Sequence, residues 1–200
     1  MRLDVGVLTV VTVLLVLLAT RAGVRLVRGR ASSWGVGVVA VVWWTVLAAA
    51  AGLAEAEHQV TQQLATSVTV MVSGRPGAVA RCARRTTDML DVSGNAGSVS
   101  WDTPDVARLR ADTCAALWSW VMSDKTHPTT DQVVALHVLA HEAVHVGGER
   151  AEAATECAAM GWDATVARAL GASDAVAQQI AASYRQQVYP TMPDEYRGGC

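Results

Sequence analysis

Two long runs of apolar residues near the start of the chain constrain its fold more than any other feature. The first run covers residues 5–20, and the second, Trp34–Ala54, contains no charged residue. About 20 apolar residues in a helix are enough to cross the hydrocarbon core of a membrane, and local thinning of the bilayer accommodates a shorter run. We therefore expect a two-helix transmembrane hairpin over residues 1–54, with spans at about 5–20 and 34–54.

The segment between the two runs, residues 21–33, carries four positive charges and no negative one, namely Arg21, Arg25, Arg28 and Arg30. Short arginine-rich loops stay in the cytoplasm. A cleaved signal peptide is the alternative for the first run, but the arginines directly behind it would then have to be exported. The expected location is the cell membrane, with a two-pass anchor in the lipid bilayer and residues 55–200 on the extracytoplasmic side.

Residues 55–200 differ from the anchor in charge and contain every cysteine. They carry eleven basic and seventeen acidic side chains, whereas residues 1–54 carry five arginines and one aspartate. An acidic domain lacks the basic surface that nucleic acids require, so we expect no nucleic-acid partner. An even number of exported cysteines predicts two disulfides, with three pairings open among Cys82, Cys114, Cys157 and Cys200.

An H-E-x-x-H motif at residues 141–145 is the most specific chemical signal in the chain. It lies in an apolar stretch whose helical start is predicted by a Thr129–Gln132 capping box. His141 and His145 are four residues apart, so both imidazoles project from one helical face and can reach a single metal ion. Glu142 flanks that face, where it can accept a proton from a water molecule that the metal activates.

The residues after the motif are expected to bring two carboxylates back to it. Two glycines end the first helix, and a second helix is predicted over residues 149–170. If the chain folds back between the two helices, Glu152 comes opposite His145 and Glu156 comes opposite His141. On this geometry Glu152 is the preferred third metal ligand, and Glu156 is either the alternative ligand or a support for one of the histidines.

His137 precedes His141 by four residues and extends the same helical stripe. A buried histidine that supports the site is the preferred interpretation, and a direct ligand role is the alternative. The stripe therefore predicts a third imidazole close to the metal-binding pair.

The remaining sequence predicts a mainly α-helical fold with at most a short β-hairpin. Residues 55–76 are compatible with either a helix or a strand. A short strand is expected at residues 98–101, and helices are expected at residues 78–91, 103–122, 129–146, 149–170 and 172–188.

The motif helix followed by a helix that bears acidic residues resembles the gluzincin class of zinc metallopeptidases. The resemblance implies a zinc cofactor with His141, His145 and Glu152 as ligands, Glu142 as the general base and Glu156 behind a ligand histidine. It also implies an edge strand beside the substrate cleft, for which residues 99–101 are the candidate, with a simple surface hairpin as the alternative. The same stretch resembles small, uncharacterised membrane-anchored proteins of high-GC bacteria.

The spacing departs from the family pattern. Glu152 follows His145 by only seven residues, which is much shorter than the gluzincin offset. Gly148 matches the glycine of the metzincin pattern H-E-x-x-H-x-x-G-x-x-H/D, but the third ligand position of that pattern is occupied here by Ala151. Glu156 therefore remains the alternative to Glu152 as third ligand.

Two functions are compatible with these observations. The first is a membrane-anchored, zinc-dependent peptidase that hydrolyses a peptide or protein substrate outside the cytoplasm, with Glu142 as general base. The alternative is a non-catalytic, zinc-stabilised domain that mediates interactions in the cell envelope. The small size of the exported part favours the alternative, whereas a glutamate beside an open metal position favours the enzyme.

Overall fold

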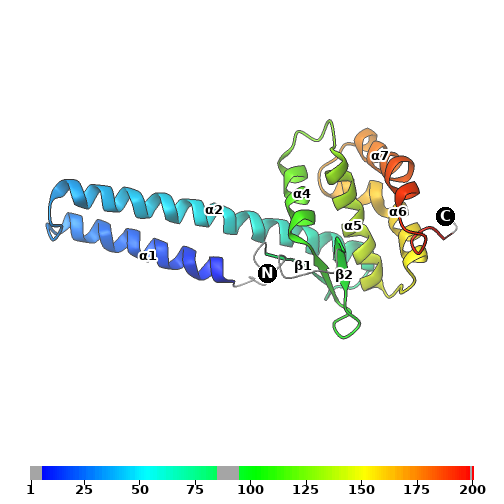
Figure 1. Cartoon of the computed structure of the whole chain (residues 1–200), viewed down its shortest axis with the longest axis horizontal. Coiled ribbons are helices and arrows are strands. Elements are labelled where there is room, and N and C mark those ends of the chain that lie inside the picture. The colour runs from blue at the N-terminus through cyan, green and yellow to red at the C-terminus, as the bar shows by residue number, and fades with distance from the viewer. Residues whose placement is uncertain (1–5, 85–94, 199) are drawn as a thin grey trace. The chain divides into compact units, whose positions relative to one another are not determined.

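The computed structural model describes residues 6–84, 95–198 and 200 (Figure 1). The chain divides into two compact units, Met1–Val60 and Thr61–Cys200. Part of the helix predicted at residues 78–91 lies outside the described residues.

The first unit is a helical hairpin built from α1 (Val7–Val27) and the first part of α2 (Trp34–Ser73). Residues 28–33 connect the helices, and Arg21 and Arg25 of the predicted basic segment lie on α1. No residue of α1 is buried, although the helix consists largely of valine and leucine. Both helices are long and apolar enough to span a membrane.

Helix α2 does not end with the apolar run but continues to Ser73. The sequence is compatible with either a helix or a strand at residues 55–76. In the structure most of these residues are helical. Its last turns belong to the second unit, where Ala65 and Val68 are part of the hydrophobic core.

The second unit contains a three-stranded sheet in the order β1-β3-β2, built from β1 (Val79–Cys82), β2 (Gly97–Val99) and β3 (Val106–Leu109). Strands β2 and β3 are antiparallel, whereas β1 pairs with β3 in parallel, with Ala80 opposite Ala107. The sheet is therefore larger than the predicted short hairpin. The strand expected at 98–101 is present but begins at Gly97 and ends at Val99.

Two helix predictions are wrong where these strands lie. Residues 79–82 form β1 in place of the first turn of a helix at 78–91, and residues 106–109 form β3 in place of the start of a helix at 103–122. Both strands have the burial pattern of alternating inward and outward side chains. Four residues are too few for that period of two to be distinguished from a helical pattern in the sequence.

Among the described residues, four further helices belong to the second unit: α4 (Ala111–Met122), α5 (Thr130–Gly147), α6 (Glu152–Ala169) and α7 (Asp174–Ser183). A π-helical turn, Tyr184–Val188, and a 3₁₀ turn, Tyr189–Thr191, follow α7. Helix α5 lies at the centre, because it contacts α4, α6, α7 and the sheet strands β2 and β3. The largest fully buried side chains around it are Trp120, Tyr184, Leu109, Leu136, Leu139 and Ile180.

The start of α5 confirms the predicted capping box. The Thr129 hydroxyl accepts a hydrogen bond from the backbone N–H of Gln132, and the Gln132 side chain accepts one from the backbone N–H of Thr129. The helix ends at Gly148, whose φ of 117° lies in the left-handed region that favours glycine.

The two predicted disulfides are present, and all four cysteines are used. Cys82–Cys114 joins β1 to α4, and Cys157–Cys200 joins α6 to the C-terminal segment. This is one of the three pairings that the sequence left open.

The pairing makes a direct prediction for thiol chemistry and stability. The two bonds close loops of 32 and 43 residues, and each is expected to stabilise the folded state by about 4 kcal/mol in the chain-entropy description. Thiol labelling of the unreduced, denatured protein should find no free thiol, and reduction should lower the thermal midpoint. Two or more reactive thiols before reduction would contradict the pairing.

Candidate metal centre

The turn between α5 and α6 brings the two helices into extensive contact. Gly148 reverses the chain, and α6 begins at Glu152, three residues later than predicted. The connecting residues include Glu149, whose backbone oxygen accepts a hydrogen bond from His145 Nδ1 at 2.8 Å. The first two turns of α6 therefore face the histidine stripe of α5, as the sequence predicted.

His141, His145 and Glu152 converge on one point. The Glu152 Oε2 atom lies 3.1 Å from His141 Nε2 and 3.3 Å from His145 Nε2, and the two Nε2 atoms are 3.1 Å apart. Ligand atoms about 2.0–2.1 Å from a tetrahedral zinc ion are separated from one another by roughly 3.3–3.4 Å. The three residues could therefore hold a metal ion with little rearrangement.

The hydrogen bonds behind the two histidines fix which ring nitrogen is available. His145 Nδ1 donates to the Glu149 carbonyl, and His141 Nδ1 faces Glu156 Oε2 at 3.0 Å, where it also donates. In neutral imidazoles both Nε2 atoms would then be acceptors, and they lie close to each other and to a carboxylate oxygen. Three converging lone pairs repel one another unless a cation lies between them. This donor set fits a metal ion.

Glu142 lies beside this point with one carboxylate oxygen unused. The side chain is buried, and its Oε2 atom has no hydrogen-bond partner among the described residues. Burial, followed by the charge of Glu152, raises the pKa of the Glu142 carboxyl to about 8. A cation or a water molecule at the centre would give the unused oxygen a partner.

Strand β2 contacts the Glu142 side chain at Gly97. A Cβ atom at Gly97 would lie 2.6–2.9 Å from three atoms of the Glu142 side chain, so residue 97 must be glycine if Glu142 keeps this position. Among the described strands β2 lies at the edge of the sheet, and of the candidate residues 99–101 only Val99 belongs to it. The contact at Gly97 was not predicted from the sequence.

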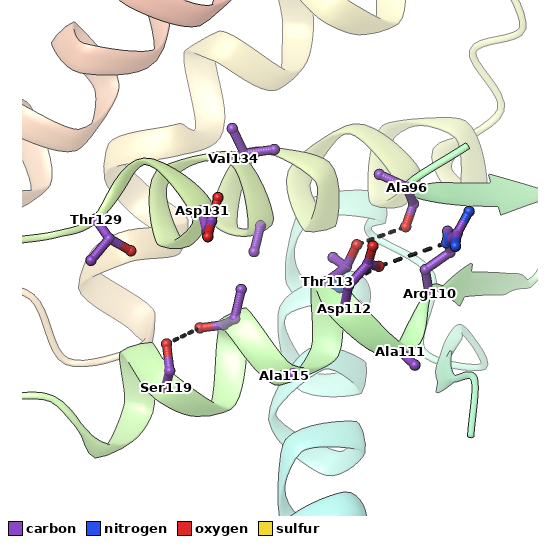
Figure 2. A pocket seen from close by; sticks show the side chains of 12 residues that line it. Ala96, Arg110, Ala111, Asp112, Thr113, Ala115, Ser119, Thr129, Asp131 and Val134 are labelled. Carbon is purple, nitrogen blue, oxygen red and sulfur yellow. Dashed lines mark hydrogen bonds and ion pairs between the residues drawn. The ribbon is translucent and has the colours of Figure 1, made fainter. Parts of the chain in front are cut away.

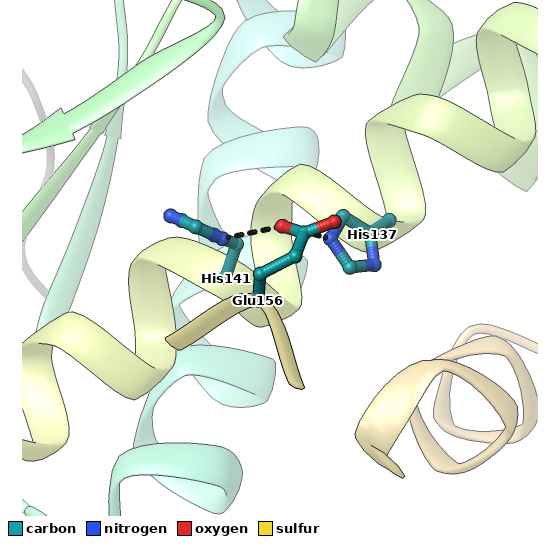
Figure 3. Close-up of side chains that lie close together, drawn as sticks. All are labelled: His137, His141 and Glu156. Carbon is teal, nitrogen blue, oxygen red and sulfur yellow. Dashed lines mark hydrogen bonds and ion pairs between the residues drawn. The ribbon is translucent and has the colours of Figure 1, made fainter. Parts of the chain in front are cut away.

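Glu156 accepts three hydrogen bonds behind the convergent site, and Figure 3 shows the two that come from His137 and His141. Its Oε2 atom accepts from His141 Nδ1 and His137 Nε2, each at 3.0 Å, and its Oε1 atom accepts from the Tyr184 hydroxyl at 2.6 Å. Burial raises the pKa of the Glu156 carboxyl, but the bonds from His137 and His141 outweigh this effect and lower the pKa well below its usual range.

His137 connects Glu156 to a further carboxylate, Asp163. The His137 Nδ1 atom lies 2.9 Å from Asp163 Oδ1, and the Tyr184 ring stacks on the imidazole at 3.5 Å. Burial lowers the pKa of His137, but the hydrogen bonds and charges of Asp163 and Glu156 outweigh it and raise the pKa to about 9. His137 is therefore a buried cation between two carboxylates at neutral pH.

His137, His141 and Glu156 are also close enough together to hold a metal ion. However, both nitrogens of His137 already face carboxylates, and both oxygens of Glu156 already accept hydrogen bonds. The nitrogens of His137 and the oxygens of Glu156 therefore already have hydrogen-bond partners. By contrast, the ligand atoms of His141, His145 and Glu152 converge on one point. The position of the second group agrees with the predicted supporting roles of His137 and Glu156.

A spacing in the sequence could have identified Asp163 as a member of the cluster. Glu152, Glu156 and Asp163 follow one another at spacings of four and seven, which places all three on one face of α6. Tyr184 had no such signal, because it lies in the π-helical turn after α7 and reaches Glu156 only through tertiary contact.

Known proteins provide no further assignment for this arrangement. No protein-family model, curated protein or solved structure matches the chain. The resemblance to gluzincins therefore depends on the residues of the site themselves.

Three aromatic or charged side chains lie around the centre. The Trp101 ring meets His145 edge-on at 6.1 Å, and the Arg150 guanidinium stacks over Trp101 at 4.6 Å. Tyr196, from the C-terminal segment, lies 5.8 Å from the His141 ring. Burial and then the charge of Glu152 raise the Tyr196 pKa, so its hydroxyl stays protonated and able to donate.

A separate pocket of about 860 Å³ lies between α4 and the first half of α5 (Figure 2). Arg110, Asp131 and Ala96 are among its lining residues, and none of the lining residues belongs to the histidine–carboxylate cluster. Ala96 directly precedes Gly97, so one end of this pocket adjoins the strand that contacts Glu142.

Proposed function

We propose that the second unit is a zinc-dependent peptidase domain anchored to the cell membrane. The observation that carries the proposal is the convergence of two histidine nitrogens and one carboxylate oxygen, 3.1–3.3 Å apart, beside the unused oxygen of Glu142. Two imidazoles and a carboxylate in tetrahedral spacing are the ligand set of catalytic zinc, which keeps its fourth position open.

In this proposal His141, His145 and Glu152 bind the ion, and other residues hold the ligands in place. Glu156 orients His141, and the backbone oxygen of Glu149 orients His145. Such outer partners fix the ring orientation and the tautomer of ligand histidines, and their loss typically weakens metal binding 10- to 100-fold.

The chain's own residues would divide the work of peptide hydrolysis. A bound zinc ion supplies a Lewis acid that polarises a carbonyl and lowers the pKa of water. Glu142 would accept the proton from the attacking water and pass it to the leaving amine. Tyr196, whose ring lies 5.8 Å from the His141 ring, would supply a hydroxyl donor for the oxygen anion. Among the described strands β2 has a neighbour on one side only, and its other edge can pair with an extended peptide.

The location follows from the first unit. Its two apolar helices cross the bilayer, the arginine-rich segment lies in the cytoplasm, and the second unit is extracytoplasmic. Two disulfides agree with that side, because such bonds persist in oxidising compartments.

The first test is the metal content of the full-length protein in detergent. We expect about one zinc per chain, lost on chelation and lost in His141→Ala or His145→Ala, because each variant removes one of three ligands. Elemental analysis after dialysis against trace zinc measures the content, and hydrolysis of casein or peptides with and without chelator measures the activity. A wild-type chain that binds no zinc would refute the proposal.

One observation favours a non-catalytic zinc-stabilised interaction domain as second candidate. Glu142 is almost fully buried and is covered by Gly97, which leaves little space for a substrate at the centre. A wild-type chain that retains zinc but cleaves nothing in a broad peptide library would support this candidate over the peptidase.

A further inference from the structure

The first unit contains a pocket that the proposed peptidase does not use. It has a volume of about 330 Å³ and lies between α1 and α2, at the end of the hairpin where residues 28–33 connect them. Its lining combines two arginines and a serine, Arg21, Arg25 and Ser32, with apolar side chains of both helices, among them Leu18, Val36 and Trp44.

The two arginines present a paired positive charge to this pocket. Arg21 and Arg25 are four residues apart on α1, so their side chains leave the same face of the helix. The sequence has no aspartate or glutamate from residue 5 to residue 54. No carboxylate of this hairpin end can therefore neutralise them, and an anion from outside the chain is the available counter-charge.

Close helix packing gives the pocket a defined shape. A Cβ atom at Gly37 would lie 2.6 Å from Leu26 Cδ1 and 2.9 Å from the Ala31 Cβ, so the two helices are in contact next to the connection. Gly37 also lines the pocket. The close approach at Gly37 therefore bounds the pocket next to the connection between the helices.

The anion could be free phosphate or the phosphate group of a lipid, and the apolar part of the pocket lining favours the lipid. Free phosphate would be satisfied by the two guanidinium groups and the Ser32 hydroxyl alone. Leu18, Val36 and Trp44 add an apolar wall, and the helices around it expose large apolar side chains such as Leu17, Val39 and Trp43. A charged rim above an apolar wall matches a phosphate group that is attached to an acyl chain.

We propose that this pocket binds the phosphate headgroup of an anionic glycerophospholipid of the cytoplasmic leaflet. Basic pockets between membrane helices are known to select such headgroups. The inference depends on the membrane placement in the proposed function and is independent of the metal centre.

The experiment uses the full-length chain in nanodiscs or detergent and compares two charge-matched double variants. Arg21→Gln with Arg25→Gln removes the pocket charges, whereas Arg28→Gln with Arg30→Gln removes the same charge from residues that do not line the pocket. Native mass spectrometry with phosphatidylglycerol or phosphatidylcholine measures bound lipid, with inorganic phosphate as competitor. A third variant, Ala40→Leu, fills the pocket and keeps both arginines.

We expect the wild type to retain phosphatidylglycerol in preference to phosphatidylcholine. The Arg21/Arg25 variant should bind it roughly 25-fold more weakly, because each arginine near an anionic surface contributes about fivefold. The Arg28/Arg30 variant should retain the preference, and Ala40→Leu should reduce it.

Other outcomes overturn the inference and identify the reason. Equal losses in both double variants would indicate nonspecific attraction to the membrane. Displacement of the lipid by millimolar phosphate would indicate a site for the free ion. A chain that is extracted from membranes by alkaline carbonate would refute the membrane placement itself.

Discussion

Glu142→Gln is expected to lower peptide hydrolysis by about 10²–10⁴-fold, which is the usual cost of losing a general base. The zinc content should stay close to that of the wild type, because the proposed metal-binding atoms belong to His141, His145 and Glu152. Glutamine keeps the size of the side chain beside Gly97 but cannot accept the proton. Steady-state rates and elemental analysis on the same preparation separate the two effects.

Asp131→Asn is the matched control for this experiment. Asp131 lies in the first turn of the same helix, α5, and its side chain is exposed. The change also converts a carboxylate to an amide of similar size, but at a position far along the helix from the motif. The control should therefore retain both zinc and activity. Full activity in Glu142→Gln would refute the proposed proton transfer even if zinc is present.

Asp163→Ala is expected to destabilise the second unit by about 3–5 kcal/mol, the usual cost of removing one partner of a buried ion pair. Asp163 is 1% exposed, and the charged His137 would be left with Glu156 alone. Glu156 also orients His141, so zinc affinity should fall 10- to 100-fold as well. Urea unfolding with and without chelator measures the stability, and competition with a zinc indicator measures the affinity.

Asp174→Ala is the control for stability. Its side chain is 90% exposed and lies 3.7 Å from Arg168, so its loss should cost less than about 1 kcal/mol. If Asp163→Ala were no more harmful than Asp174→Ala, the buried chain of hydrogen bonds from Asp163 through His137 and Glu156 to His141 would not support the site.

The sequence predicts those parts of the site that depend on local spacing. The H-E-x-x-H stripe fixes the relative directions of His141 and His145, and the capping box fixes the start of α5. The glycines after the motif predict a tight return, which is why the sequence alone places Glu152 and Glu156 opposite the histidines.

Contacts between distant segments could not be predicted in this way. The residue patterns of β1 and β3, Val-Ala-Arg-Cys and Val-Ala-Arg-Leu, pair in register although 27 positions separate them, and each is too short to identify a strand by itself. Tyr184 reaches Glu156 from a different element, and the choice among three cysteine pairings depends on which segments pack together. Strand pairing, the Tyr184–Glu156 contact and the disulfide pairing depend on which distant segments pack together, and no single stretch of the sequence indicates them.

The contact between Gly97 and Glu142 has a consequence for sequence variation. The two positions are far apart in the chain, yet any side chain at residue 97 would occupy the space that the Glu142 carboxylate now fills. A side chain at residue 97 is therefore expected only where Glu142 is replaced or moves, whereas Gly97 tolerates a side chain of equal or smaller size at position 142. In homologous chains, a residue larger than glycine at position 97 should coincide with the loss of glutamate at position 142, so this pair can identify active and inactive members before either is purified.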